Sequence, residues 1–244
     1  MKEFNSNNYV IEVQGSMRNV SAKDWDALLE AQTEPTPFMR HAYLSAMEES
    51  GSASAKTGWK LQLVTLRHTL PPQAGQLAGA AVLYIKPHSY GEYVFDWAWA
   101  DAYQRHGLNY YPKAVSAVPF TPVPGSRLLA DSGQSQSALL SAMVELAQNE
   151  DWSSLHLLFL SNDDLQVTET AGWLSRHTVQ FHWHNAAYDD FEDFLRALNQ
   201  EKRKKIKQER RKVAEAGVIF KAFEGAQIQS ADWDFFYQCY AQTY

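Results

Sequence analysis

The stretch HSYGEYVFDWAWADAYQRHGLNYYPK, from His88 to Lys113, combines carboxylates with aromatic rings at close spacing. Glu92, Asp96 and Asp101 lie among tyrosines, tryptophans and a phenylalanine. Carboxylates bind ammonium groups and accept protons, and aromatic walls bind cations and the apolar faces of ligands. The composition of this stretch therefore favours a binding site for a cationic amine or for a sugar-peptide.

An alternating pattern runs through the middle of this stretch, over residues 92–100. If these residues form a β-strand, Glu92 and Asp96 share one face with small alanines, which leaves room for a ligand beside Asp96. The competing interpretation is a packed central strand whose Asp96 and Asp101 cap neighbouring turns. With the loop that follows, the candidate acceptor-binding residues are Glu92, Tyr93, Asp96, Trp99, Asp101, Tyr103, Tyr111 and Lys113. Asp96 and Asp101 are the candidates for a catalytic base, and nothing in the pattern selects between them.

The segment NQEKRKKIKQERRK, at 199–212, concentrates positive charge in a chain whose net charge is −6. Nine basic and two acidic residues lie between Arg196 and Lys212. Helical periodicity places the cations on one side of a long helix predicted over 189–215. These cations are Arg196, Arg203, Lys204, Lys207, Arg210 and Arg211. Their side of the helix is either a solvated surface that neutralises an acidic body or a binding site for a polyanion: tRNA, the phosphates of coenzyme A, or anionic lipid headgroups.

Composition excludes several other classes of protein. The single cysteine, Cys239, cannot form an intrachain disulfide or a cysteine-based zinc cluster. His182 and His184 point to one face of a predicted strand, but a third ligand does not accompany them, so we expect no metal site. No apolar run reaches the ~20 residues that span a bilayer, and the N-terminus lacks the apolar core of a signal peptide. We therefore expect a cytoplasmic protein without a transmembrane segment.

Periodicity and turn residues predict alternating helices and strands. The predicted helices cover residues 19–32, 36–52, 135–150, 163–173, 189–215 and 230–244. The predicted strands cover residues 59–68, 76–86, 92–100, 113–120, 154–160, 177–185 and 218–225. This order is typical of an α/β fold with a mixed, largely antiparallel sheet flanked by helices. We expect a first domain over 1–185, followed over 186–244 by the basic helix and the start of a second domain.

Several long strings of the sequence resemble one known family. From the N-terminus, the strings are HAYLSAMEESGS…TGWKLQLVTL, GAAVLYIKPHSYGEYVFDWAWADAYQRHGLNYYPK, VPFTPVPGSRLL and QFHWHNAAYDDFEDFLRALNQEKRKKIKQERRKVAEAGVIF, in the order of that family. They are similar to the Fem-like predicted N-acyltransferases, often described as peptidoglycan biosynthesis or recognition proteins. The resemblance covers the chain from about Trp25 to Tyr244. It implies two tandem domains of the GNAT type, of which 1–185 is the first, while most of the second lies beyond this sequence.

The resemblance implies transfer of an acyl group from acyl-CoA or aminoacyl-tRNA to an amine, in peptidoglycan or cell-envelope biosynthesis. The donor would be a co-substrate, and we expect no tightly bound cofactor. Such a reaction requires that both partners are positioned, that the ammonium loses a proton, and that the oxyanion is stabilised. The acceptor would be an amine-bearing small molecule or a cell-wall precursor.

One segment departs from the pattern that the resemblance implies. GNAT enzymes usually hold the CoA pyrophosphate on a Q/R-x-x-G-x-G/A turn at a helix N-terminus. The corresponding segment here is TPVPGSRLLADSGQSQ, whose prolines lack the N–H donors that a phosphate needs. We therefore do not expect the first domain to bind CoA in the usual way. The alternative to an enzyme is a non-catalytic recognition or scaffold module that retains only the acceptor-binding half.

Overall fold

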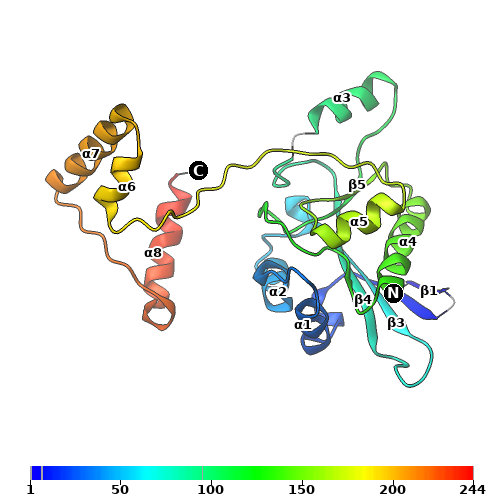
Figure 1. The fold of residues 1–244 in the computed structure, drawn as a ribbon. Coiled ribbons are helices and arrows are strands. Elements are labelled where there is room, and N and C mark those ends of the chain that lie inside the picture. Colours follow the sequence, from blue (N-terminus) through cyan, green and yellow to red (C-terminus); the bar gives the residue numbers. More distant parts are fainter. Residues whose placement is uncertain (1, 7, 95, 244) are drawn as a thin grey trace. The chain divides into compact units, whose positions relative to one another are not determined.

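The computed structural model describes residues 2–6, 8–94 and 96–243. The chain divides into two compact units, residues 1–177 and 178–244 (Figure 1). The sequence placed the corresponding boundary after residue 185, and the residues between these two positions, 178–185, are extended and exposed.

A mixed sheet forms the centre of the first unit, with the strand order β1-β2-β3-β4-β5-β7 and with β6 paired to β4. The pairing of β5 with β7 is parallel, and every other pairing in this sheet is antiparallel. The strands are β1 (Lys2–Ser6), β2 (Tyr9–Gln14), β3 (Lys60–His68), β4 (Leu77–Lys86), β5 (Lys113–Ser116), β6 (Leu129–Ala130) and β7 (Leu155–Leu157). The predicted α/β fold with a largely antiparallel sheet is confirmed.

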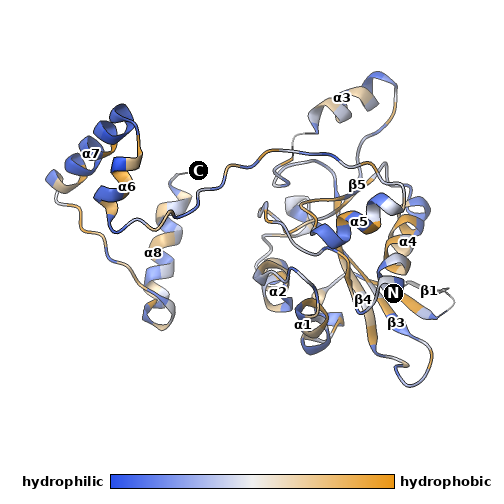
Figure 2. Cartoon of the chain, in the orientation of Figure 1, coloured by the Kyte–Doolittle hydropathy of each residue, from blue (hydrophilic) through white to orange (hydrophobic). Residues whose placement is uncertain are grey.

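Helices cover both faces of this sheet (Figures 1 and 2). The α-helices of the first unit are α1 (Ala22–Glu30), α2 (His41–Glu49), α3 (Trp97–Arg105), α4 (Gly133–Asn149) and α5 (Asn162–Thr170). Val82 and Tyr84 of β4 pack in one core with Trp25 of α1, and Leu83 packs in the other core with Met143 of α4. Because β4 is buried on both faces, its sequence is a nearly continuous apolar run.

Local sequence signals explain where these helices begin. The Ser21 hydroxyl accepts a hydrogen bond from the backbone N–H of Asp24 and caps α1. The Trp25 indole is fully buried, and its Nε1–H donates to the Met39 carbonyl oxygen at 2.7 Å. This bond joins α1 to the turn before α2, so the first core is fixed by a polar contact as well as by apolar area.

The strand predicted over 92–100 is wrong. Residues 97–105 form helix α3, and Phe95 lies outside the described residues. The alternation of tryptophan with alanine is typical of a strand, but alanine is the strongest helix former, and three alanines at 98, 100 and 102 stabilise a helical turn. Glu92 and Asp96 therefore do not share a strand face, and what brings them together is the irregular loop before α3.

Other predicted elements are shorter or absent. The strand predicted over 113–120 ends at Ser116, before Pro119, which cannot donate to a ladder. The hairpin of β1 and β2 was not predicted. The strands predicted over 177–185 and 218–225 do not form, and the regular secondary structure in the described residues of the second unit, 178–243, consists of helices joined by irregular segments.

The helix predicted over 189–215 is two helices, α6 (Phe191–Ala197) and α7 (Gln200–Glu215), followed by α8 (Ser230–Ala241). The break occurs because the Asn199 side chain accepts from the backbone N–H of Lys202 and caps a new helix. Within the described part of this unit, Leu195 is the one buried hydrophobic residue. In the described residues of the whole chain, every helix is too short or too polar to cross a bilayer.

Candidate functional site: a buried cluster of two lysines and two carboxylates

Two lysines face each other at one end of the sheet. Lys86, the last residue of β4, is the direct antiparallel partner of Lys113, the first residue of β5. Both residues are 0% exposed. Like charges directly opposite each other repel, and a buried ammonium group requires compensating partners. The register of this one strand pair therefore places two buried ammonium groups side by side, and they need buried negative partners.

Two carboxylates from the loop between β4 and α3 provide negative partners. The Lys113 ammonium donates to Glu92 Oε2 at 2.8 Å and also to Asp96 Oδ2. Glu92 is 2% exposed and Asp96 is 1% exposed. One buried ammonium group thus holds two buried carboxylates, and this contact fastens the loop onto the sheet.

Lys86 has different surroundings, although it lies beside Lys113. Its ammonium donates to the Tyr90 carbonyl oxygen at 2.9 Å and lies 3.5 Å from the centre of the Trp59 ring. Burial lowers the pKa of Lys86 to about 8, with the Lys113 cation acting in the same direction and Glu92 opposing both. Lys86 can therefore lose its proton within a pH range in which an exposed lysine stays charged.

The two carboxylates differ in basicity. Burial raises the pKa of Glu92 despite the attraction of Lys113. Burial also acts to raise the pKa of Asp96, but the hydrogen bonds from Lys113 and Tyr110, together with the nearby Ser89 hydroxyl, outweigh it, so this pKa is lowered. Glu92 is thus the stronger base of the two, whereas the sequence had offered Asp96 and Asp101 as the candidate bases.

A hydrogen-bonded chain leads from Asp96 towards β7. The Tyr110 hydroxyl donates to Asp96 Oδ2 at 2.8 Å and lies 3.4 Å from Nε2 of His156. The same imidazole nitrogen lies 2.8 Å from Ser154 Oγ. Burial and then the Lys113 cation lower the pKa of His156 to about 4. The imidazole is therefore neutral at pH 7 and adds no positive charge to the cluster.

The structure brings together some of the predicted acceptor-binding residues and separates others. Glu92, Asp96 and Lys113 share the cluster. Tyr111 lies beside it, with its ring centre 5.9 Å from Lys113 Nζ, and the ring of Tyr103 is 5.1 Å from that of Tyr110. Three predicted residues lie outside the cluster on exposed surface: Tyr93, Trp99 and Asp101.

Asp101, which the sequence had offered as a candidate catalytic base, therefore does not belong to the cluster. It lies on α3, and none of the residues of this fully described helix is buried. Because an exposed carboxylate keeps its water, it lacks the environment that would tune it as a base.

Three members of the cluster were not predicted: Lys86, Trp59 and His156. Lys86 ends an apolar strand, and only the register with β5 shows that its ammonium is buried. His156 lies on β7, a strand that was predicted but whose position beside β5 was not.

The loop over the cluster has a strained backbone and carries exposed rings. Tyr93 and Phe120 both have φ of 57°, a conformation that costs about 1–3 kcal/mol for a residue with a side chain. A Cβ on Gly91, whose φ is 79°, would come within 2.6 Å of the Phe120 ring. The rings of Tyr90 and Trp97 are 5.9 Å apart and are 66% and 52% exposed. Such rings provide an accessible apolar wall next to the buried charges.

The N-terminus of α4, where a phosphate would bind in the pattern described above, is already occupied. The Ser132 hydroxyl accepts from the backbone N–H of Ser135 and caps the helix. The Asp131 carboxylate accepts from the Ser135 hydroxyl and contacts Nε2 of His68, each at 2.7 Å. An anion approaching this end of the helix would meet a carboxylate, which repels it.

A buried carboxylate, Asp164 of α5, holds the proline-rich loop before β6. Its Oδ2 accepts the backbone N–H of Arg127 at 2.5 Å and that of Leu128 at 3.2 Å. The Arg127 guanidinium is buried and donates to the carbonyl oxygens of Leu158 and Val123, at 3.0 and 2.6 Å. Polar contacts therefore fix this loop, and the backbone N–H groups of Arg127 and Leu128 are already engaged by Asp164 and do not face a ligand phosphate.

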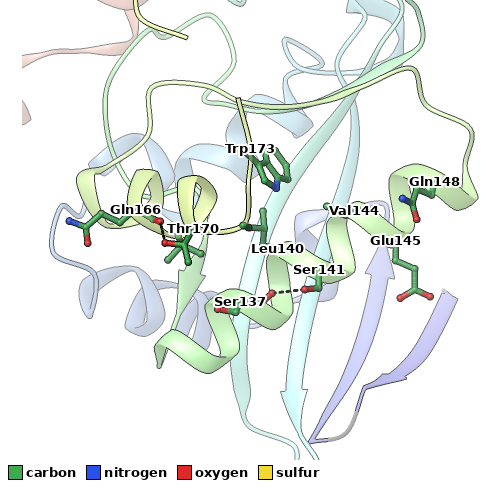
Figure 3. Close-up of a pocket in the computed structure, with 11 residues that line it drawn as sticks. Ser137, Leu140, Ser141, Val144, Glu145, Gln148, Gln166, Thr170 and Trp173 are labelled. Carbon is green, nitrogen blue, oxygen red and sulfur yellow. Dashed lines mark hydrogen bonds between the residues drawn. The ribbon is translucent and has the colours of Figure 1, made fainter. Parts of the chain in front are cut away.

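A hollow in the first unit lies elsewhere, between α4 and α5 (Figure 3). It is an open groove of about 690 Å³, with Leu140 and Val144 on α4 and Trp173 after α5. Glu145 is its one charged lining residue. Because this groove lacks the paired carboxylates and lysines of the cluster, it is the weaker candidate for acid–base chemistry.

The basic residues of the second unit are partly engaged with neighbours. Arg196 pairs with Asp193 at 2.9 Å, Lys207 with Glu192 at 2.6 Å, and Arg211 with Glu215 at 3.5 Å. The guanidinium of Arg210 lies 4.2 Å from the centre of the Phe191 ring, and Arg203 donates to the Leu198 carbonyl oxygen at 3.1 Å. These contacts weaken the positive field of α7 without removing it, and the helix is hydrophilic along its length (Figure 2).

A metal centre finds no support in the part of the chain that the structure describes, because no three potential ligand residues cluster there. The rings of His182 and His184 stack at 6.5 Å.

The sheet with helices on both faces and the buried cluster at its end define an α/β protein with a polar interior site. A family model of FemAB-like proteins, described as peptidoglycan biosynthesis/recognition, matches residues 16–244. The chain belongs to the FemAB-like family.

Among curated proteins, a urease accessory protein UreF of Azoarcus sp. (strain BH72) is 31% identical over 119 residues, or 49% of this chain. The aligned part is 47% of that relative, so the chain spans about half of its length.

Three solved structures share part of the fold. A ribosomal-protein-alanine N-acetyltransferase from Brucella melitensis biovar Abortus 2308 is 15% identical, with a TM-score of 0.40, over 71% of this chain and 99% of its own. A Trypanosoma brucei acetyltransferase is 16% identical at 0.37, over 72% and 99%. A glucosamine-6-phosphate N-acetyltransferase from Arabidopsis thaliana is 10% identical at 0.37, over 71% and 97%. Likeness of this degree says nothing about the ligands of the present chain.

Proposed function

We propose that this chain acts in the transfer of an acyl group to an amine in peptidoglycan biosynthesis, and that segment 88–113 provides the acceptor site. The observation that carries the proposal is the pair of buried carboxylates, Glu92 and Asp96, fastened under exposed aromatic rings in a member of the FemAB-like family. Carboxylates next to an aromatic wall suit an acceptor that carries a primary amine.

In this reaction the amine nitrogen attacks the carbonyl carbon of an activated ester or thioester. A C–N bond forms, the C–O or C–S bond of the donor breaks, and the nitrogen loses a proton. Glu92 is the favoured base because its raised pKa brings its basicity nearer to what proton transfer requires. The amine proton passes to Glu92, while the Tyr110 hydroxyl donates to the neighbouring carboxylate, Asp96.

The donor, acyl-CoA or aminoacyl-tRNA, is not assigned a place in the first unit. The carboxylate of Asp131 at the N-terminus of α4 disfavours a pyrophosphate there. If the donor is a tRNA, α7 is the surface we propose for it, and affinity must then fall steeply as salt rises.

Turnover tests the proposal directly. The full chain is incubated with a muropeptide that carries a free primary amine and with either acyl-CoA or aminoacyl-tRNA, and products are detected by mass spectrometry. We expect a product heavier by the acyl group, and we expect Glu92→Gln to lower the rate by about 10²-fold or more. Asp101→Asn, on the exposed α3, is the matched control and should leave the rate unchanged. Full activity in Glu92→Gln would refute the role of this carboxylate.

A second function, recognition without catalysis, is favoured by one observation. Lys113 already satisfies one oxygen of each carboxylate, so the cluster can serve as a stable binding site that never transfers a proton. Binding of the muropeptide without product from either donor would support this function and exclude the first.

A further inference from the structure

Two buried carboxylate oxygens have no hydrogen-bond donor among the described residues. They are Oε1 of Glu92 and Oδ1 of Asp96. The other oxygen of each carboxylate binds the same Lys113 ammonium, so the two carboxylates are neighbours in one cluster. Buried polar atoms are nearly always paired in folded proteins, so two unpartnered oxygens on neighbouring buried carboxylates indicate a place for a ligand that donates hydrogen bonds.

The charge of the cluster depends on Lys86. With both lysines protonated and both carboxylates ionised, the four groups sum to zero. With Lys86 neutral, the cluster carries a charge of −1 and can accept a cation. The groups around Lys86 are the Trp59 ring, His88, Glu92 and Lys113, and Lys113 also pairs with Asp96.

We propose that Glu92 and Asp96 bind the primary ammonium group of a ligand through these two oxygens, and that Lys86 regulates this binding by competing for their charge. The identification of this ligand as the acyl acceptor rests on the proposed function, whereas the binding of an ammonium group does not. A site of this kind selects N–H donors, because a cation without them leaves both oxygens unpartnered.

The attachment of the covering segment is compatible with entry of such a ligand. Between residues 87 and 112, the buried residues among those described are Ser89, Glu92, Asp96 and Tyr110. Hydrogen bonds and charge pairs therefore carry much of the attachment of this segment to the sheet, and the partly buried Val94 adds an apolar contact with a small core. Elements held in this way open at lower free-energy cost than packed ones.

The regulation by Lys86 predicts a pH dependence of known sign. With the pKa of Lys86 at about 8, roughly a tenth of molecules have this amine neutral at pH 7. Apparent affinity scales with the fraction of competent molecules, so ammonium binding should be about tenfold weaker at pH 7 than at about pH 9.5. An alkylamine remains largely protonated up to about pH 10, so the ligand itself does not cause this change.

The experiment is calorimetric titration of the full chain with n-butylammonium at about pH 7 and about pH 9.5. We expect the wild type to bind about tenfold more tightly at the higher pH. In Lys86→Met the affinity should be equal at the two pH values and about tenfold above that of the wild type at pH 7. Butyltrimethylammonium, which has the same charge and no N–H group, is the control ligand and should not bind.

The result that overturns the proposal is wild-type affinity that is absent or does not change with pH, and this test stands even if Lys86→Met fails to fold. Equal binding of butyltrimethylammonium would also overturn it. Acyl transfer that is insensitive to n-butylammonium would contradict this subsite and leave the proposed function standing. Binding of n-butylammonium without acyl transfer would support this subsite and contradict the proposed function.

Discussion

Lys113→Met is expected to lower the free energy of unfolding by about 3–5 kcal/mol. The substitution removes the one ammonium group that both Glu92 and Asp96 contact, and each carboxylate is almost fully buried. Uncompensated buried charge is among the most costly changes to a folded protein. Urea unfolding of the variant and of the wild type, followed by far-ultraviolet circular dichroism, measures the difference.

Two control variants separate the effect of unpaired buried charge from the effect of losing a lysine side chain. Lys205→Met removes an exposed lysine, 76% exposed at its side chain, and should change stability by less than about 0.5 kcal/mol. A triple variant that adds Glu92→Gln and Asp96→Asn to Lys113→Met should recover much of the loss, because the unpaired charges are gone. A loss below about 1 kcal/mol in Lys113→Met would show that the cluster is not the buried ion network described above.

Asp164→Ala is expected to cost about 3 kcal/mol or more in the first unit. The carboxylate accepts the backbone N–H groups of Arg127 and Leu128 and the side-chain amide of Gln136. Alanine would leave two buried backbone donors unpaired, each at about 1–3 kcal/mol. Thermal unfolding by calorimetry gives the comparison, with the exposed neighbour Asp163→Ala as the matched variant. A melting temperature for Asp164→Ala that equals that of Asp163→Ala would contradict this account of the loop.

The sequence predicted the fold where local signals and burial agree. A capping serine such as Ser21 fits only the start of a helix, and the apolar run of β4 fits a strand that is buried on both faces. Prediction failed where one sequence pattern fits two kinds of secondary structure. The Trp–Ala alternation over 97–100 fits a strand as well as a helix, and the cap at Asn199 lies inside a segment whose helical periodicity continues through it.

The site was predicted in part for a related reason. Glu92, Asp96 and Lys113 were identified because acidic and aromatic residues are dense in one stretch of chain. Lys86 and His156 were not, because their roles depend on strand register and on the β5–β7 pairing, which are long-range properties. A lysine at the end of an apolar strand shows its burial only when its cross-strand partner is known.

The central claim is that segment 88–113 receives the amine-bearing acceptor, and hydrogen–deuterium exchange tests it most directly. Exchange is compared with and without a muropeptide that carries a free primary amine. The account predicts that the amides of residues 88–112 become protected while those lining the α4–α5 groove of Figure 3 do not change. Protection of the groove, with exchange over 88–112 unaltered, would contradict the claim and move the binding site to the groove.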